Sequence, residues 1–444
     1  MQLILYINFI LPKTGNGMRI KNLIYFTLSI FLFLFKCSPA TFDNACNPDS
    51  SIFKNVYTLK VIVGDKSSFC GISPVSTSNV SSGGNTGTQN TNPNNIIKQP
   101  KFLLVPNSGA GSISVFTIDA TSGVLTQIPG SPFSSPTLNG PRFISVHPSG
   151  LFVYVANGSN ASVAGFSINS TTGGLTSLGA AFTAPANTYA LVLNSSGTYL
   201  YAASYLGKQV FLFSINQANG SLTLIQTFNA TNSAAGQIGA VFIDSTGNFL
   251  YTGNTDTPGI FDAFAINQST GFLTLLGAPG PYIGLGNNAI AVTVDPFSRF
   301  VYGGYYSSNH VSAFTMNTTT GALTPIAGSP FVTGGNAGTF ITVEATGKFV
   351  YVANSGSASI SGFAINSSTG VLTTIAGSPF AGTASPSVIY TDPTSSFLYS
   401  ANTANPGTIS GFTINKTTGA LTQIAGSPWT TNGNGTFGLA VVSY

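Results

Sequence analysis

The sequence predicts an all-β protein whose main domain, residues 102–444, is a seven-bladed β-propeller of four-stranded blades closed by the C-terminal strand. Two marks recur seven times at nearly constant spacing: an apolar-aromatic strand, and a glycine turn that leads into a strand with a Leu-Thr start. Helix-forming residues are scarce, and Glu344 is the only glutamate in the chain. A four-strand pattern repeated every 40 to 50 residues is typical of propeller blades.

The first mark is the second strand of each predicted blade. The third residue of this strand is a tyrosine in six copies, whereas the first copy has Leu104. The seven strands begin at Phe102, Phe152, Tyr199, Phe249, Phe300, Phe349 and Phe397. The turn glycines are Gly123, Gly173, Gly220, Gly271, Gly321, Gly370 and Gly419. Glycine at these places fits a tight turn that needs a positive φ.

Within one period, alternation of apolar and polar residues predicts four strands. In residues 349–393 we expect strands over 349–354, 359–366, 371–375 and 387–391, with a loop that opens at Gly377-Ser-Pro-Phe380.

The two ends of the repeat region predict how the ring closes. The region begins with a second strand, at 102–107, and ends with residues 437–443, which align with inner strands of other blades. We expect this C-terminal segment to pair with 102–107 and complete the blade that residues 102–128 begin, so that no strand edge is left open.

Residues 1–36 are typical of an export signal. A short basic stretch follows Met18, where we expect translation to start, and an apolar run continues to Phe35. Cys37 comes next, as the lipidated cysteine does in bacterial lipoproteins, although Lys36 stands where a small residue is usual. We expect a lipid-anchored protein of the bacterial cell envelope, at the outer membrane or cell surface. Ordinary cleavage of the signal and an uncleaved anchor are the alternatives.

Residues 37–73 form a small cysteine-containing segment. In an oxidising compartment Cys46 and Cys70 would close a disulfide worth about 3 kcal/mol, and two unpaired thiols are the alternative. Residues 74–101 are rich in Ser, Asn and Gly and are predicted to be a flexible linker.

Charged residues are few, which excludes several classes of function. The whole chain has 14 Lys and Arg residues and 10 Asp and Glu residues. Residues 102–444 hold five of the basic residues and seven of the acidic ones. Nucleic-acid binding needs several cations on one face, so we expect no nucleic-acid partner. We find no metal-ligand spacing, no phosphate-binding glycine loop and no spacing suggestive of a Ser-His-Asp triad, and we expect no cofactor.

The repeats resemble those of lactonase-type seven-bladed propellers and the related YVTN-repeat proteins. The resemblance rests on Tyr-Val-Ala-Asn strands such as 351–354, the Ile-Ser-x-Phe-x-Ile strands and the Thr-Gly-x-Leu-Thr turns, and it covers residues 102–444. It implies a central channel in which 6-phosphogluconolactonases and a muconate-lactonising cyclase of the family use His, Glu and Arg. Family members typically carry histidines just before an inner strand. In one copy of the repeat this position reads Gly140-Pro-Arg-Phe143, and no copy has a histidine there, so we assign no catalytic residue.

One repeat position gathers most of the acidic residues of the domain. It lies where an inner strand enters a turn, and we interpret its side chains as turn caps rather than as a metal or acid–base site. The residues are His147, Asn194, Asp244, Asp295, Glu344 and Asp392.

The candidate ligand-binding residues lie on the opposite face, which bears the loops that lead into the inner strands. As isolated charges on a polar surface, several of them would ordinarily be solvated. They are Arg142, Tyr189, Lys208, Gln237, Asp256, Asn288 and His310.

Two functions remain open. The first is a non-enzymatic binding or surface scaffold module, expected to be a monomer, that binds a protein or small molecule on its loop-bearing face and meets the membrane only through its lipid. The alternative is a lactonase-family hydrolase of the 6-phosphogluconolactonase type, or a cyclase, with a diverged site. The scarcity of acid–base residues leads us to expect no lactone hydrolysis at an enzymatic rate.

Overall fold

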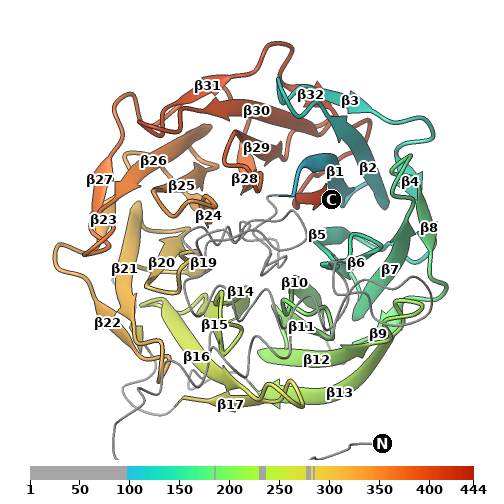
Figure 1. The fold of residues 1–444 in the computed structure, drawn as a ribbon, viewed down its shortest axis with the longest axis horizontal. Coiled ribbons are helices and arrows are strands. Elements are labelled where there is room, and N and C mark those ends of the chain that lie inside the picture. Colours follow the sequence, from blue (N-terminus) through green and yellow to red (C-terminus); the bar gives the residue numbers. More distant parts are fainter. Residues whose placement is uncertain (1–97, 185–186, 230–236, 277–281, 284–285) are drawn as a thin grey trace, which may run out of the picture. The chain divides into compact units, whose positions relative to one another are not determined.

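The computed structural model describes residues 98–444 except 185–186, 230–236, 277–281 and 284–285. The predicted signal sequence, Cys37, Cys46, Cys70 and most of the predicted linker lie outside the described residues. The described part is all β, and seven four-stranded antiparallel blades are arranged in a ring around a central axis (Figure 1). No helix in the described ranges has the length and apolar character of a membrane span.

Each blade runs outward from an inner strand that faces the channel. The inner strands are β5 (Pro141–Val146), β10 (Thr188–Leu193), β14 (Ile238–Ile243), β19 (Ala289–Val294), β24 (Gly338–Val343), β28 (Pro386–Thr391) and β33 (Ala440–Ser443). The second strands are β6 (Phe152–Asn157), β11 (Tyr199–Ser204), β15 (Phe249–Asn254), β20 (Phe300–Tyr305), β25 (Phe349–Asn354), β29 (Phe397–Asn402) and β1 (Pro100–Asn107). We number the blades in this order, with β5 in blade 2 and β33 and β1 in blade 1.

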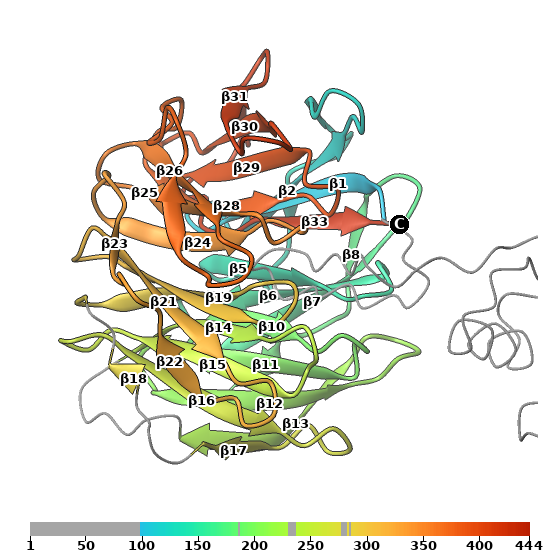
Figure 2. The same cartoon turned by 60° about the vertical axis from the view of Figure 1, so that its left-hand side comes forward.

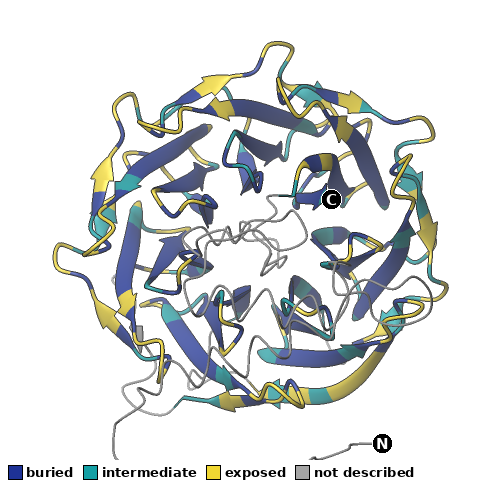
Figure 3. Ribbon diagram, viewed as in Figure 1, coloured by how far each residue is buried: buried dark blue, intermediate teal, exposed yellow. Residues whose placement is uncertain are grey.

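The outer half of each blade holds the third and fourth strands. The third strands are β2 (Ser112–Ile118), β7 (Ser162–Ile168), β12 (Gln209–Ile215), β16 (Ile260–Ile266), β21 (His310–Met316), β26 (Ser359–Ile365) and β30 (Thr408–Ile414). The outer strands are β3 (Leu125–Gln127), β8 (Leu175–Ser177), β13 (Leu222–Asn229), β17 (Leu273–Leu275), β22 (Leu323–Pro325), β27 (Leu372–Thr374) and β31 (Leu421–Gln423). Burial follows this order: second strands are almost wholly buried, and outer strands are largely exposed (Figure 3).

Five blades carry a fifth, two-residue strand that we did not predict. It pairs with the start of the third strand, in the region expected to be a loop. These strands are β4 (Phe133–Ser134), β9 (Phe182–Thr183), β18 (Tyr282–Ile283), β23 (Phe331–Val332) and β32 (Trp429–Thr430). In blades 1, 5 and 7 the serine of the preceding Gly-Ser-Pro accepts a hydrogen bond from a third-strand N–H, as Ser427 Oγ does from Gly411 at 2.8 Å. Blade 6 has the same serine contact but only an isolated bridge between Ile360 and Phe380. A strand of two residues is too short to show an alternation of apolar and polar residues in the sequence.

The ring closes as predicted. β33 pairs antiparallel with β1, with Phe102 opposite Val442 and Leu104 opposite Ala440 (Figure 2). The boundaries differ slightly from the prediction, because β1 begins at Pro100 and β33 begins at Ala440 rather than at residue 437. Gly438 passes so close to blade 2 that a Cβ there would lie 2.3 Å from the Arg142 carbonyl oxygen. This close approach requires glycine at residue 438.

A hydrogen bond between blades joins the two marks of the repeat. In six blades the buried second-strand tyrosine donates its hydroxyl to the carbonyl of the turn glycine in the next blade. The pairs are Tyr154–Gly220 (2.8 Å), Tyr201–Gly271 (2.7 Å), Tyr251–Gly321 (2.9 Å), Tyr302–Gly370 (3.0 Å), Tyr351–Gly419 (2.7 Å) and Tyr399–Gly123 (2.8 Å). All seven turn glycines have a positive φ, between 72° and 76°. Leu104 has no hydroxyl, so blade 1 lacks this bond to Gly173.

We predict that Tyr351→Phe lowers the free energy of unfolding by about 1–3 kcal/mol, because it leaves the buried Gly419 carbonyl without its partner. Urea denaturation of the two proteins measures this difference. The matched control is Tyr306→Phe, since Tyr306 is 46% exposed. Equal midpoints for the two variants would show that the blade-to-blade bond contributes nothing.

Candidate functional site

The inner strands of blades 2 to 7 share a β-bulge near their first residue. At each bulge the second strand has one residue fewer than the inner strand, so the extra side chain leaves the alternating pattern. The bulged residues are Arg142 and Phe143, Tyr189, Gly239, Ile290, Thr339 and Ser387. All of them except Arg142 line one cavity of about 390 Å³ at the loop-bearing mouth of the channel. The bulges therefore build the wall of this cavity, which we call the mouth cavity.

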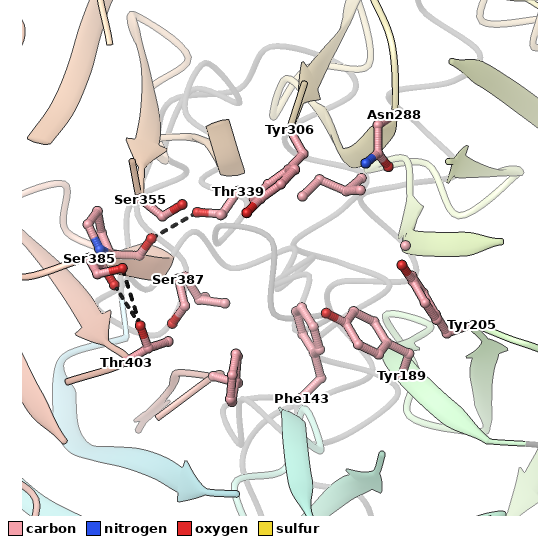
Figure 4. Close-up of a pocket in the computed structure, with 15 residues that line it drawn as sticks. Phe143, Tyr189, Tyr205, Asn288, Tyr306, Thr339, Ser355, Ser385, Ser387 and Thr403 are labelled. Atoms are coloured by element: carbon pink, nitrogen blue, oxygen red, sulfur yellow. Dashed lines mark hydrogen bonds between the residues drawn. The ribbon is translucent and has the colours of Figure 1, made fainter. Parts of the chain in front are cut away.

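The mouth cavity has two chemically different sides (Figure 4). Blades 2 and 3 supply the aromatic side, with Phe143, Tyr189 and Tyr205, and Phe437 of the C-terminal segment completes it. Blades 6 and 7 supply the hydroxyl side, whose members are Thr339, Ser355, Ser385, Ser387 and Thr403. Asn288, Ile290 and Tyr306 lie between the two sides. No Asp, Glu or His lies among the described residues that line the cavity.

The aromatic side is a connected group of rings. Tyr189 stacks on Tyr205 with ring centres 4.9 Å apart, and its ring centre lies 5.6 Å from that of Phe143. Burial and the neighbouring Tyr189 raise the pKa of Tyr205, and Arg142 lowers it by less. Tyr205 therefore keeps its proton at neutral pH and can donate a hydrogen bond.

Two members of the hydroxyl side already use their protons within the protein. Thr339 Oγ1 donates to the Pro386 carbonyl at 2.9 Å, and Ser387 Oγ donates to the Thr436 carbonyl at 2.9 Å. A hydroxyl has one proton and two lone pairs. Thr339 and Ser387 therefore present acceptors to the cavity, and a ligand that meets these two hydroxyls has to donate.

Arg142 lies in a second cavity beside the mouth. This side pocket has a volume of about 310 Å³ and shares Tyr189 and Tyr205 with the mouth cavity. The guanidinium carbon of Arg142 lies 5.1 Å from the ring centre of Tyr189 and 4.5 Å from that of Phe437. Its Nη1 donates to the Tyr189 hydroxyl at 3.4 Å. The rings fix the guanidinium plane at the edge of the mouth cavity.

The acidic residues at the shared repeat position cap turns, as predicted. Oδ1 of Asp392 accepts hydrogen bonds from the N–H groups of Ser396 and Phe397 at 2.8 and 2.6 Å. Asp244, Asp295, Glu344 and Asn194 accept from equivalent N–H groups. His147 lies in the same turn, with Nδ1 accepting from the Ser149 N–H at 3.2 Å. Among the described residues, no three His, Cys, Asp or Glu side chains gather as a metal site would need.

Of the seven candidate ligand-binding residues, three line a cavity. Tyr189 lines both cavities, Arg142 the side pocket and Asn288 the mouth cavity. The structure does not bring the others to either cavity: Lys208 and Asp256 lie in loops between second and third strands, and His310 begins β21. Gln237 precedes β14 and binds Thr255 through its backbone N–H, and Gly239 lines the cavity in its place.

Several lining residues were missed by sequence reasoning, notably Phe143, Tyr205, Tyr306 and Phe437. Alternation along a strand assigns each residue to one of two faces, and a bulge breaks this alternation. The aligned triplet at the start of each inner strand, such as Thr188-Tyr-Ala190 with its bulged middle residue, could have found Phe143. Tyr205 and Tyr306 instead directly follow second strands, and Phe437 precedes β33, so no bulge marks them.

Comparison with known proteins identifies the family. The family profile described as Lactonase, 7-bladed beta-propeller matches residues 72–192, 190–337 and 308–433. The chain belongs to this family. No curated protein matches this lactonase-family chain.

Solved structures with the same fold are distant in sequence. A Bacteroides fragilis protein provisionally named a 6-phosphogluconolactonase superposes with a TM-score of 0.65 at 21% identity, covering 78% of this chain and 98% of its own. The periplasmic gluconolactonase of Pseudomonas aeruginosa superposes with a TM-score of 0.63 at 18% identity, covering 77% and 99%. At these identities the similarity establishes the fold of this lactonase-family propeller and not its substrate.

One buried carboxylate of this propeller lies outside the turns. Asp262 in β16 is 2% exposed and accepts a hydrogen bond from Asn254 Nδ2 at 2.6 Å. In blades 1, 6 and 7 the equivalent residue is a serine that accepts from the second-strand asparagine and donates onward to a loop carbonyl, as Ser361 does to Thr333 at 2.6 Å. Burial raises the pKa of Asp262 to about 6; the Asn254 hydrogen bond lowers it and the neighbouring Asp256 raises it further.

We predict that Asp262 makes the protein less stable as the pH rises from about 4 to about 6. The folded carboxyl binds its proton more tightly than the unfolded one, because its pKa is higher in the folded protein. Over this pH range the free energy of unfolding therefore falls by about 1.4 kcal/mol per pH unit, roughly 3 kcal/mol in all. Chemical denaturation of the wild type and Asp262→Asn at pH 4.5 and 7.5 measures the part of this change above pH 4.5, about 2 kcal/mol.

The comparison with Asp262→Asn is needed because other groups titrate. Burial lowers the pKa of His147, which makes the fold less stable as the pH falls through about 6.5. Asp392 has a pKa raised by burial. Both contributions are common to the two proteins and cancel in the difference. If both proteins showed the same pH dependence, Asp262 would not carry the predicted proton.

Proposed function

We propose that the mouth cavity binds a neutral, hydroxyl-rich ring, such as a sugar or a sugar lactone. The observation that carries this proposal is the division of the cavity into an aromatic side and a side of hydroxyl acceptors. A sugar ring presents C–H faces that pack on aromatic rings and hydroxyl groups that donate to Thr339 and Ser387. A cavity of about 390 Å³ is within the size range of small-molecule sites.

Membership of the Lactonase family favours a lactone over other rings. It gives more weight to a hydrolase, or to a protein that binds lactones, than to a purely structural scaffold. The names of the Bacteroides fragilis and Pseudomonas aeruginosa proteins support the same ligand class. A phosphorylated lactone fits less well, because a phosphate usually requires several donors or cations and Arg142 is the only cation among the described residues that line either cavity.

Hydrolysis of a bound lactone is the second candidate, favoured by the meeting of Arg142 and Tyr189. Their N–H and O–H groups converge at the edge of the mouth cavity, where they could stabilise the oxyanion that forms when water attacks the lactone carbonyl. The described lining residues contain no Asp, Glu or His to take a proton from that water. We therefore expect at most the modest acceleration that oxyanion stabilisation alone provides.

For binding, we predict that the purified protein binds D-glucono-δ-lactone and D-glucose, and that Tyr205→Ala weakens both affinities about ten-fold through loss of ring packing. Isothermal titration calorimetry measures the affinities. Phe272→Ala is the matched control, because Phe272 is an exposed aromatic residue in the turn before β17, outside the cavity. The proposal fails if neither ligand binds, or if both variants lose affinity equally.

For hydrolysis, the rate of ring opening of D-glucono-δ-lactone and of 6-phosphogluconolactone should be compared with the spontaneous rate at the same pH. A rate above it that Arg142→Gln abolishes would support the hydrolase. The spontaneous rate, with lactone still bound, would support a binding protein.

We also propose that the chain is exported and anchored by a lipid on Cys37, which lies outside the described residues. Cys37→Ser should move the protein from the detergent phase to the soluble fraction, because durable anchoring depends on the acyl chains. Phase partitioning measures this shift, and labelling with a fatty-acid analogue tests the lipid directly. An intact protein that takes up no label would contradict the anchor.

A further inference from the structure

The side pocket is a built site around Arg142. The bulge in β5 directs this residue out of the alternating pattern, and the rings of Tyr189 and Phe437 hold its guanidinium. Gly158, in the loop after β6, gives the side chain room: a Cβ there would lie 2.6 Å from Arg142 Cδ and 2.7 Å from Nε. The stem of Arg142 therefore packs closely against Gly158, while the two rings hold its guanidinium.

Arg142 has no ionic partner among the described residues. The salt bridge between Arg299 and Asp295 lies in the turn after β19, on the opposite face. Arg142 donates its 3.4 Å hydrogen bond to the neutral Tyr189 hydroxyl, and its side chain is partly buried. A partly buried guanidinium is favourably neutralised by an anion, and its planar fork matches the two oxygens of a carboxylate.

We infer that the side pocket binds the carboxylate of a sugar acid, with Arg142 as its partner and the sugar ring in the mouth cavity. The two cavities adjoin at Tyr189 and Tyr205, which line both, and the inferred ligand lies across this boundary. Asn187, which also lines the side pocket, carries a neutral amide whose Nδ2 donates to the Gly158 carbonyl at 3.4 Å. A single arginine and an amide suit a monoanion such as a uronate or aldonate better than a phosphate dianion. This inference rests on the proposed function, because it adds a second subsite to the ligand of the mouth cavity.

The test compares D-glucuronate with D-glucose, which lacks the carboxylate, by calorimetry on the purified full-length protein. We expect glucuronate to bind at least about ten-fold more tightly at low salt, since a hydrogen bond to a charged group is worth that much. Raising the salt concentration should reduce this preference. Arg142→Gln should weaken glucuronate binding at least about ten-fold more than glucose binding. Lys416→Gln, which removes an exposed cation from the turn before β31, is the matched control and should keep the preference.

The outcomes separate the inference from the proposed function. Glucose binding without a preference for glucuronate, or an equal loss of both in Arg142→Gln, overturns the carboxylate site and leaves the proposed function standing. Arg142-dependent binding of glucuronate without glucose binding supports the carboxylate site and contradicts the neutral ligand. Binding of neither overturns both. Tighter binding of glucose 6-phosphate than of glucuronate contradicts the choice of a carboxylate. If Arg142→Gln does not fold, Arg142→Lys, which keeps the charge but loses the fork, should retain only part of the preference.

Discussion

The hydrogen bond from the second-strand tyrosine to the turn glycine of the next blade is the contact on which the ring depends. It joins the most buried strand of one blade to the outer turn of its neighbour, and the Tyr399–Gly123 pair carries it across the closure of the ring. The positive φ of each turn glycine places its carbonyl within reach of the hydroxyl. A buried hydroxyl without this acceptor would be costly, so each buried tyrosine requires a turn carbonyl in the next blade. Leu104, opposite Gly173, has no such requirement.

With the blades held in this way, residues at the channel mouth can vary without affecting the scaffold. The bulges in blades 2 to 7 release residues at the start of the inner strands from the packing between blades. The cavity-lining residues among them differ from blade to blade: aromatic in blades 2 and 3, hydroxyl-bearing in blades 6 and 7. A seven-fold repeat thereby produces a cavity with two unlike sides. This asymmetry, rather than any single reactive group, is the reason for expecting a ring with one apolar face and donating hydroxyls.

Because charged residues are scarce, most buried polar groups form hydrogen bonds with uncharged partners. Hydroxyl and amide groups bind each other and the backbone, as in the chain from Asn354 through Ser361 to the Thr333 carbonyl. Buried carboxylates such as Asp392 cap turns through N–H groups. Asp262 departs from this pattern, because an ionisable carboxyl stands where blades 1, 6 and 7 have a serine hydroxyl. Arg142 departs from it too, as a fixed cation at the channel mouth without a described counter-ion.

The sequence by itself determined the all-β class, the blade count, the closure by the C-terminal segment and the role of residues such as Asp392, because each of these depends on periodicity or on contacts within a few residues. It also marked Arg142, Tyr189 and Asn288 as candidates. Only the tertiary structure decided which residues meet. Phe437 and Phe143 lie almost 300 positions apart in the chain, and the closure of the ring brings both to one cavity. The inward direction of Tyr189 and Ser387 depends on bulges, which are defined by pairing between strands and leave no trace in the alternation of a single strand.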